Sequence, residues 1–240
     1  MKAFLKFLGG WLLVLFFCIA AIGQDKRNGR PESQPSPKVD AAREPVKETS
    51  AVTRYTYEFN QPDFVISHVV IEHDPTGHGQ LTFVQRTETP IVEPFELSAS
   101  AMARILGFWR ELRFLDSHDN YQSAKSFPHL GTYKIGLDDG QRRRTAEYNW
   151  SDNKAAWALA NEYRRAGDQA IWVFDMKLAR DMQPLNAPSL LTELESRLTR
   201  NDLSDPQQLV PLLTELKTDE HIPLIARNHA GRILKKIEKN

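Results

Sequence analysis

The chain has 240 residues, of which 41% are apolar and 26% are charged, and this is the ordinary composition of a globular protein. A chain of this length forms one or two domains. Its 31 basic residues balance its 31 acidic residues. This balance argues against the broad basic surface with which proteins bind nucleic acid, and also against a polybasic membrane patch.

The N-terminus has the pattern of an export signal. Lys2 and Lys6 form a short positive region, and an unbroken apolar run, WLLVLFFCIAAI, follows over residues 11–22. Ala21 and Gly23 occupy the −3 and −1 positions of a cleavage site. We therefore expect residues 1–23 to be a signal peptide.

An uncleaved anchor is the alternative interpretation of the same segment. The uncharged run over residues 7–24 has 18 residues, which is marginal for a membrane-spanning helix. In both cases Lys2 and Lys6 stay inside, so the rest of the chain is expected to be periplasmic or secreted. The uncleaved form would be held at the inner membrane by residues 1–23, and that segment would be the chain's only contact with the membrane.

The single cysteine, Cys18, lies within this leader. The remaining chain therefore has no residue for a disulfide, a catalytic thiolate or a cysteine zinc site. Without Lys2 and Lys6 it has 29 basic and 31 acidic residues. Its fold must be held by an apolar core alone, for which its length is sufficient.

Residues 24–50 are rich in charge and contain four prolines, with only two valines as large apolar residues. Such a composition buries too little apolar surface to offset chain entropy. We expect a disordered linker between the N-terminal segment and a folded region.

From residue 51 the sequence predicts a sheet. Tyr55, Tyr57 and Phe59 alternate with polar residues, and the segment FVISHVVIEH is β-branched and apolar on both faces, as in a central strand. The turn residues 74–79 predict a return strand. Four strands are expected, over residues 55–59, 64–73, 81–84 and 91–97.

A helix and a second hairpin follow. Ser98 has the chemistry of an N-cap, and apolar residues from Met102 to Leu112 recur at helical spacing. Residues 132–137 and 142–150 alternate as strands, and Asp138-Asp139-Gly140 predicts the turn between them. The sequence thus predicts an α+β domain over residues 51–150, with an antiparallel sheet packed by a helix.

After Ser151 the pattern is helical to the end of the chain. Apolar stripes run over residues 157–163 and 171–182, and Pro184 and Pro188 interrupt them. A short helix is expected over residues 189–198, and Asp205-Pro206 has the chemistry of a helix start. We expect an all-helical region over residues 151–240.

The densest set of residues that can ligate a metal lies around the first hairpin. On a strand, His68 and Glu72 face one way and His73 faces the other, while Asp74 and His78 lie in the turn. Their spacing matches no helical zinc motif. We interpret them as a solvated hairpin tip and predict no metal site and no cofactor.

Ser151 and Lys154 have the S-x-x-K spacing of penicillin-interacting enzymes. The separate K-T-G strand of those enzymes is missing from the sequence. Because Ser151 precedes a predicted helix, we interpret it as the N-cap of that helix and predict no catalytic residue.

The strongest basic cluster is Arg142-Arg143-Arg144, with Arg164-Arg165 later in the chain. It is either an anion site or a solvated run paired with Asp138 and Asp139, and we favour the second interpretation. Four tryptophans occupy inward-facing positions of the predicted elements, which is typical of core residues. They are Trp109, Trp150, Trp157 and Trp172.

Residues 205–240 resemble a HEAT-type helical pair. The stretch LKTDEHIPLIARNHAGRILKKI has an acidic turn at Asp219-Glu220, an apolar start to the second helix and then Ala226, Arg227 and Ala230. Ile222-Pro223 replaces the usual Val-Arg after the turn. Since stable solenoids need about three repeats, one pair is expected to dock on its neighbours instead of forming a long concave surface.

The chain beyond the leader also resembles uncharacterised secreted bacterial proteins. The resemblance is carried by LRFLDS (112–117), FPHLGTYKIGL (127–137) and YRRAGDQAIWVFD (163–175). It implies a bacterial envelope protein and supplies no catalytic residues.

The sequence contains no P-loop, no G-x-S-x-G, no G-x-G-x-x-G and no EF-hand loop. Our leading hypothesis is therefore a non-enzymatic binding or accessory protein whose partner is another envelope protein or a cell-wall component. The alternative is a periplasmic or secreted hydrolase acting on cell-wall or peptide substrates, with a metal at His73, Asp74 and His78 or with Ser151 and Lys154 as its reactive pair.

Overall fold

The computed structural model describes residues 53–85 and 89–239. The expected signal peptide or anchor at residues 1–23 and the expected linker at residues 24–50 lie outside the described residues. Within the described part of the chain, no helix combines the length and the apolar character needed to cross a bilayer.

The strands form one six-stranded sheet in which every neighbouring pair is antiparallel, in the order β4-β3-β2-β1-β5-β6. The first four strands are a meander, and β5 returns to pair with β1. The bounds are β1 Arg54–Asn60, β2 Ile66–His73, β3 His78–Gln85, β4 Ile91–Glu96, β5 Thr132–Asp138 and β6 Arg143–Tyr148.

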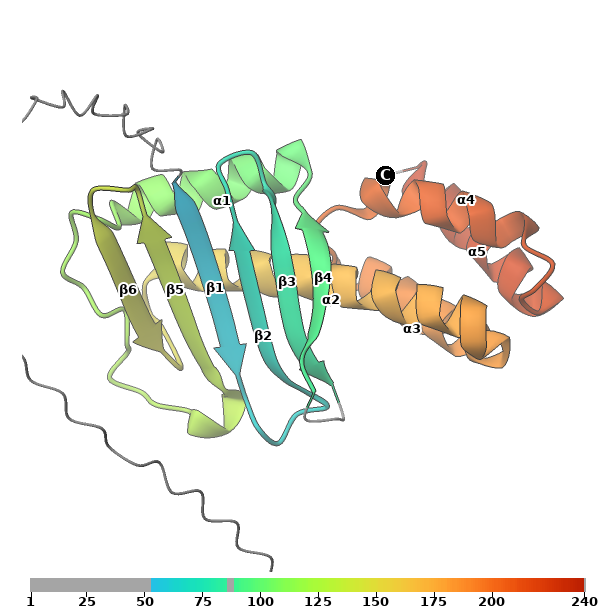
Figure 1. Cartoon of the computed structure of the whole chain (residues 1–240), viewed down its shortest axis with the longest axis horizontal. Coiled ribbons are helices and arrows are strands. Elements are labelled where there is room, and N and C mark those ends of the chain that lie inside the picture. Colours follow the sequence, from blue (N-terminus) through green and yellow to red (C-terminus); the bar gives the residue numbers. More distant parts are fainter. Residues whose placement is uncertain (1–52, 86–88, 240) are drawn as a thin grey trace, which may run out of the picture. The chain divides into compact units, whose positions relative to one another are not determined.

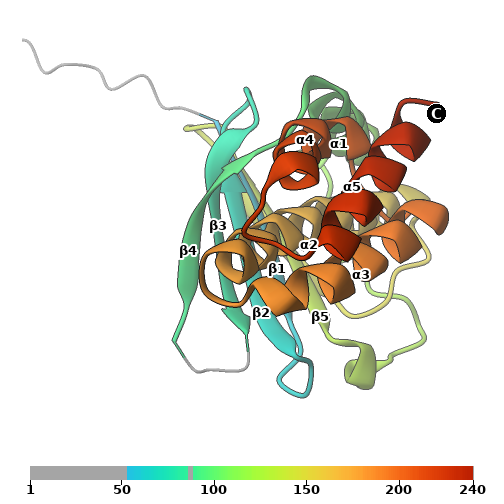
Figure 2. The ribbon, with the colours of Figure 1, turned by 90° about the vertical axis from the view of Figure 1, so that its right-hand side faces the viewer.

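One face of the sheet is packed and the other is open. Side chains alternate between the two faces, as the period of a strand requires. Tyr57, Ile71, Leu81 and Phe83 on the packed face are at most 1% exposed. Helices α1 (Ala99–Leu112) and α2 (Lys154–Met182) lie on this side of the sheet (Figures 1 and 2). This is the α+β arrangement that the sequence predicted.

Helix α1 begins at the predicted cap, where the Ser98 side chain accepts a hydrogen bond from the Ala101 backbone N–H. Its apolar stripe is buried, with Ile105 fully covered and Trp109 4% exposed. The helix ends at Arg113, which adopts the left-handed conformation.

Helix α2 is 29 residues long and contributes to two cores. Its first half packs on the sheet, and at Gly167 an added Cβ atom would lie only 3.3 Å from Ile71 Cδ1, so the missing side chain permits close packing here. Its second half, from Trp172, packs against the C-terminal helices.

The C-terminal helices enclose the second core, with Leu191, Leu213 and Ile233 fully buried. The predicted proline interruption is present, since α2 ends at Met182 and a short 3-10 turn precedes α3. Within the C-terminal helical pair, α5 (Leu224–Ile237) packs on α3 (Ala187–Thr199). The bounds are η2 Pro184–Asn186, α3 Ala187–Thr199, η3 Pro206–Leu209, α4 Val210–Thr218 and α5 Leu224–Ile237.

A buried polar joint ties the C-terminal helices to α1 and α2. The Glu162 side chain, 0% exposed, accepts hydrogen bonds from Arg104 at 2.8 Å and from Ser204 Oγ at 2.7 Å, and it also pairs with Arg165. Gln169 exchanges two hydrogen bonds with the backbone of Asp205. Burial opposes the ionised form of Glu162, but the bonds from Arg104 and Ser204 outweigh it, so the pKa is lowered.

The expectation that four tryptophans are core residues is correct for Trp109 and Trp172, which are 4% and 2% exposed. It is wrong for Trp157, which is 40% exposed, while Trp150 is half-buried beside it with ring centroids 5.2 Å apart. Trp157 also contacts Tyr133 of β5, with ring centroids 6.5 Å apart, but these two ring contacts leave part of its side chain exposed.

Candidate functional site on the open sheet face

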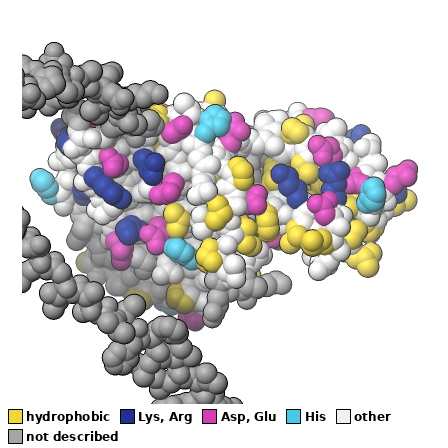
Figure 3. Space-filling view, in the orientation of Figure 1, with side chains coloured by type: hydrophobic (Ala, Val, Ile, Leu, Met, Phe, Trp, Pro, Cys, Tyr) yellow, Lys and Arg dark blue, Asp and Glu magenta, His cyan; other side chains and the backbone are white. Residues whose placement is uncertain are grey.

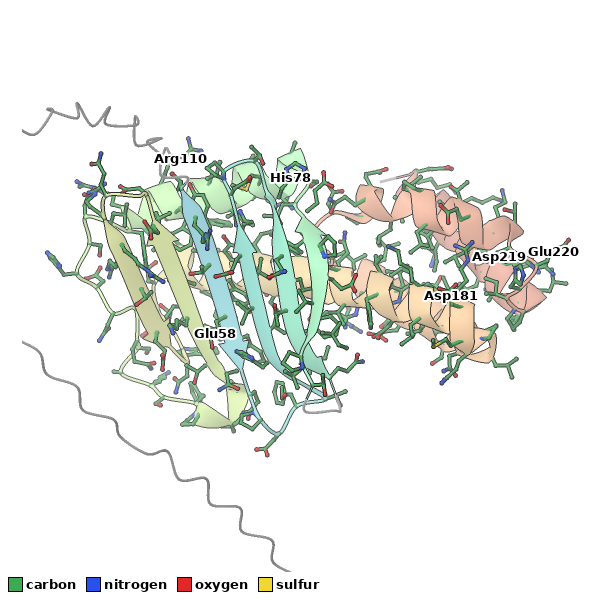
Figure 4. The ribbon with its side chains drawn as sticks, in the orientation of Figure 1. Glu58, His78, Arg110, Asp181, Asp219 and Glu220 are labelled. Carbon is green, nitrogen blue, oxygen red and sulfur yellow. The ribbon has the colours of Figure 1, made fainter. Side chains whose placement is uncertain are left out.

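The open face of the sheet is polar over β1, β5 and β6. Its outward residues there include Arg54, Glu58, Lys134, Arg143 and Glu147. Figure 3 shows charged side chains of both signs interspersed over these strands, while hydrophobic side chains gather toward β4 and the helices beyond it. Glu58 lies in the middle of this face and His78 at one end (Figure 4).

A hollow of about 220 Å³ crosses β1, β5 and β6 on this face. Its floor is Gly136, whose cross-strand neighbours are Thr56 and Thr145. A side chain at this position would clash with Thr56 Oγ1, so glycine leaves the backbone bare between two hydroxyl groups. The other residues that line the hollow are Arg54, Thr56, Glu72, Leu137, Asp138, Gly140, Arg143 and Thr145.

Two arginines flank one carboxylate at the rim of this hollow. In the strand register, Asp138 lies opposite Arg54 of β1 on one side and opposite Arg143 of β6 on the other. Asp138 Oδ1 accepts a hydrogen bond from the Gly140 backbone N–H. Among the described residues, neither guanidinium has a hydrogen-bond or ion-pair partner, and the Glu72 carboxylate has none either. These three groups are free to meet a ligand.

A second hollow of about 320 Å³ adjoins the first and shares Arg54 and Glu72 with it. It reaches Asp74 and His78 at the β2–β3 turn. His78 Nε2 lies 3.6 Å from Glu96 Oε1. Hydrogen bonds from the Thr76 side chain and backbone lower the pKa of Asp74. The two hollows together are called the open-face groove below.

His73 borders the groove, but its ring is buried and both ring nitrogens form hydrogen bonds within the protein. Its Nδ1–H donates to the Asp74 carbonyl at 2.7 Å, and its Nε2 accepts from Tyr163 Oη at 2.7 Å. Tyr163 Oη in turn accepts from Trp109 Nε1 at 3.2 Å. Burial lowers the pKa of His73 and keeps the ring neutral.

The five residues considered as metal ligands are thus divided between two faces. His68 bonds Glu58 at 3.0 Å on the open face, and His73 points into the core. Within residues 53–85 and 89–239, no three histidine, aspartate or glutamate side chains are gathered as a metal site requires.

The interpretation of Ser151 as a helix cap is wrong by two residues. Asn153 is the N-cap of α2, and its side chain accepts from the Ala156 backbone N–H at 3.0 Å. Ser151 is buried, and its Oγ accepts from the Asn153 backbone N–H at 3.2 Å. Lys154 is exposed on the first turn of α2, and no hydrogen bond joins these two described side chains.

The arginine triplet is split among three environments. Arg142 forms ion pairs with Asp139 and Asp116. Pairing with Asp139 was expected from the sequence, and pairing with Asp116 was not. Arg144 donates to the Phe114 carbonyl and lies 4.3 Å above the Phe114 ring. Only Arg143 faces the groove. Of the later pair, Arg164 bonds Asp202 and Arg165 belongs to the polar joint with Glu162.

Sequence reasoning missed Arg54, Gly136 and Thr145 as groove residues. One signal was present, because a glycine inside a strand pattern often marks a position that must stay free of a side chain. The pairing that brings Arg54 beside Arg143 depends on long-range register, which local pattern does not contain.

Comparison with known proteins adds no assignment to this geometry, because no protein-family model and no curated protein matches the chain.

Proposed function

We propose that this chain is an exported binding protein of the bacterial cell envelope, non-enzymatic, which holds a polar envelope component in its open-face groove. The observation that carries the proposal is that three charged side chains with no partner among the described residues, Arg54, Glu72 and Arg143, line the same hollow.

The chemistry of the groove indicates the kind of ligand. Two guanidinium groups on either side of Asp138 suit a carboxylate, because arginine presents a fork of donors that matches this group. Glu72 suits an amine or hydroxyl donor, and Thr56 and Thr145 supply hydroxyl groups of either role. A peptide segment, either of a partner protein or of the cell wall, carries all of these groups.

The location rests on the leader pattern, in which a positive start precedes a long apolar run. A near-neutral chain with no cysteine beyond the leader is compatible with work outside the cytoplasm, where a free thiol would be oxidised. The chain is therefore proposed to be exported and to bind peptide-like ligands in its open-face groove.

Site-specific photo-crosslinking tests the groove directly. A photoreactive residue at Thr145 lies in the groove, and one at Glu147 lies on the same face of the same strand outside it. In cells expressing the full chain, Thr145 should give a discrete crosslink and Glu147 should not. A crosslinked protein band indicates a partner protein, and crosslinked chain that remains with washed cell walls indicates a wall component.

Reversing the charge of the two groove arginines tests whether the crosslink depends on them. Arg54→Glu with Arg143→Glu should abolish the Thr145 crosslink, because it removes both guanidinium groups that face the ligand. Lys154→Glu, at an exposed lysine outside the groove, should leave it unchanged. Equal crosslinking from Thr145 and Glu147 would refute the proposal, and so would hydrolysis of wall fragments that is lost in Ser151→Ala, since this would identify a hydrolase.

A further inference from the structure

The second half of α2 exposes large apolar side chains on one side. Leu178 is 45% exposed and Met182 is 74% exposed, and Leu185 of the following turn is 84% exposed. Phe174, half-buried against Phe83 of the sheet, begins this stripe one helical turn before Leu178. Contiguous apolar surface of this kind is typical of an interaction site.

Two hollows lie along this stripe. One of about 180 Å³ lies between β4, α2 and η3, and one of about 580 Å³ lies between the ends of β3 and β4, α2 and α3. Both are lined by Phe174, so the two hollows adjoin along α2 between Ala166 and Met182. At 1.5 Å per residue this stretch is about 24 Å long. It is called the α2 groove below.

The rim of the α2 groove is acidic. Its lining includes the carboxylates of Glu93, Glu96 and Glu193, and Lys177 is the one cation among the described residues that line it. Arg197 offsets Glu193, with which it forms an ion pair. Asp181 adds an exposed carboxylate on the same side of α2 as Leu178, near the far end of the helix (Figure 4). An apolar floor with an acidic rim complements a ligand that is apolar and basic.

The β4 edge of this groove is poorly suited to an added strand. Pro94 has no backbone N–H to offer, and Glu93 on the inward side places a charge beside the apolar floor. The Glu96 carbonyl already accepts a bond from Gln208 Nε2 at 3.3 Å. A groove about 24 Å long matches a helix of about 16 residues. We infer that the α2 groove docks an amphipathic helix of a partner protein whose polar flanks are basic.

Designed peptides test this inference with the purified full chain. Two fluorescent peptides share a leucine heptad pattern, and one has lysine and the other glutamate at the polar positions. Fluorescence anisotropy should show the lysine peptide binding at least about tenfold more tightly than the glutamate peptide, with the difference shrinking as salt rises. Leu178→Asp should weaken binding of the lysine peptide at least about tenfold.

Leu224→Asp is the matched control, because Leu224 is 61% exposed on α5 and lies outside the α2 groove. It should leave the peptide affinity unchanged. Equal binding of both peptides, or an unchanged affinity in Leu178→Asp, would overturn the inference. Sedimentation of the chain alone gives a third outcome: a dimer that Leu178→Asp dissociates would mean that a second copy occupies the groove, and this also overturns it.

Discussion

The two faces of the sheet differ in how they treat polar groups. On the packed face, His73, Tyr163 and Trp109 satisfy one another in a continuous chain that ends at the Asp74 carbonyl. On the open face, Arg54, Glu72 and Arg143 have no partner among the described residues. The same strands therefore pair these polar groups on one side and leave three charged groups unpaired on the other, and the alternation of residues along each strand separates the two sets.

Two neighbouring residues of β2 give the strongest test of the difference between the packed and the open face. Ile71 is fully buried against Gly167 of α2, and Val70 is half-buried on the open face. Ile71→Ala leaves a cavity and should lower the free energy of unfolding by about 2–5 kcal/mol. Val70→Ala should cost less than about 1 kcal/mol. Urea denaturation of both variants measures the difference, and equal losses would show that the faces are not distinct.

Two glutamates make the same comparison for charge. Glu162→Gln leaves Arg104 and Arg165 without their counter-ion in the polar joint. The loss should be about 2–3 kcal/mol, at the lower end for a buried pair because Arg104 is 38% exposed.

The control is Glu58→Gln on the open face, where His68 and Lys134 are the partners. Solvent screens these pairs, so the expected loss is below about 1 kcal/mol. Thermal unfolding of both variants decides between them. A Glu162→Gln protein as stable as Glu58→Gln would mean that the joint does not hold the C-terminal helices.

Local pattern predicted the elements because each carries its own signal. Alternation around Tyr57 predicts β1, Ser98 caps α1, and Pro184 follows the end of α2 while Pro188 lies in the first turn of α3. The cap of α2 was placed wrongly because Ser151, Asp152 and Asn153 are all good cap residues. Burial of Ser151 decides the choice in favour of Asn153, and that burial is a tertiary property.

The open-face groove could not be predicted from local sequence patterns, because it also depends on tertiary structure. Arg54 and Arg143 lie far apart in the chain and meet only because β5 pairs with β1 on one side and with β6 on the other. Strand order and register follow from the whole core, so the residues that line the groove could not be read from any one segment.

His73 of β2 gives the test with the smallest expected effect, which is a change in how the free energy of unfolding depends on pH. Burial lowers the pKa of His73 below its unfolded value of about 6.5, so the unfolded chain binds a proton that the folded chain resists. His73 therefore contributes stability that is fully present above about pH 6.5 and is lost as pH falls toward the lowered pKa. The slope of unfolding free energy from this residue is at most about 1.4 kcal/mol per pH unit.

His73→Gln should flatten the slope of stability between about pH 6.5 and 5, because glutamine does not titrate there. Val70→Ala, on the open face of the same strand, changes no titrating side chain and should leave the slope in place. Denaturation at a series of pH values measures both. If the His73→Gln slope equals that of the wild type, another group controls the acid response and the neutral, core-bound role of His73 is wrong.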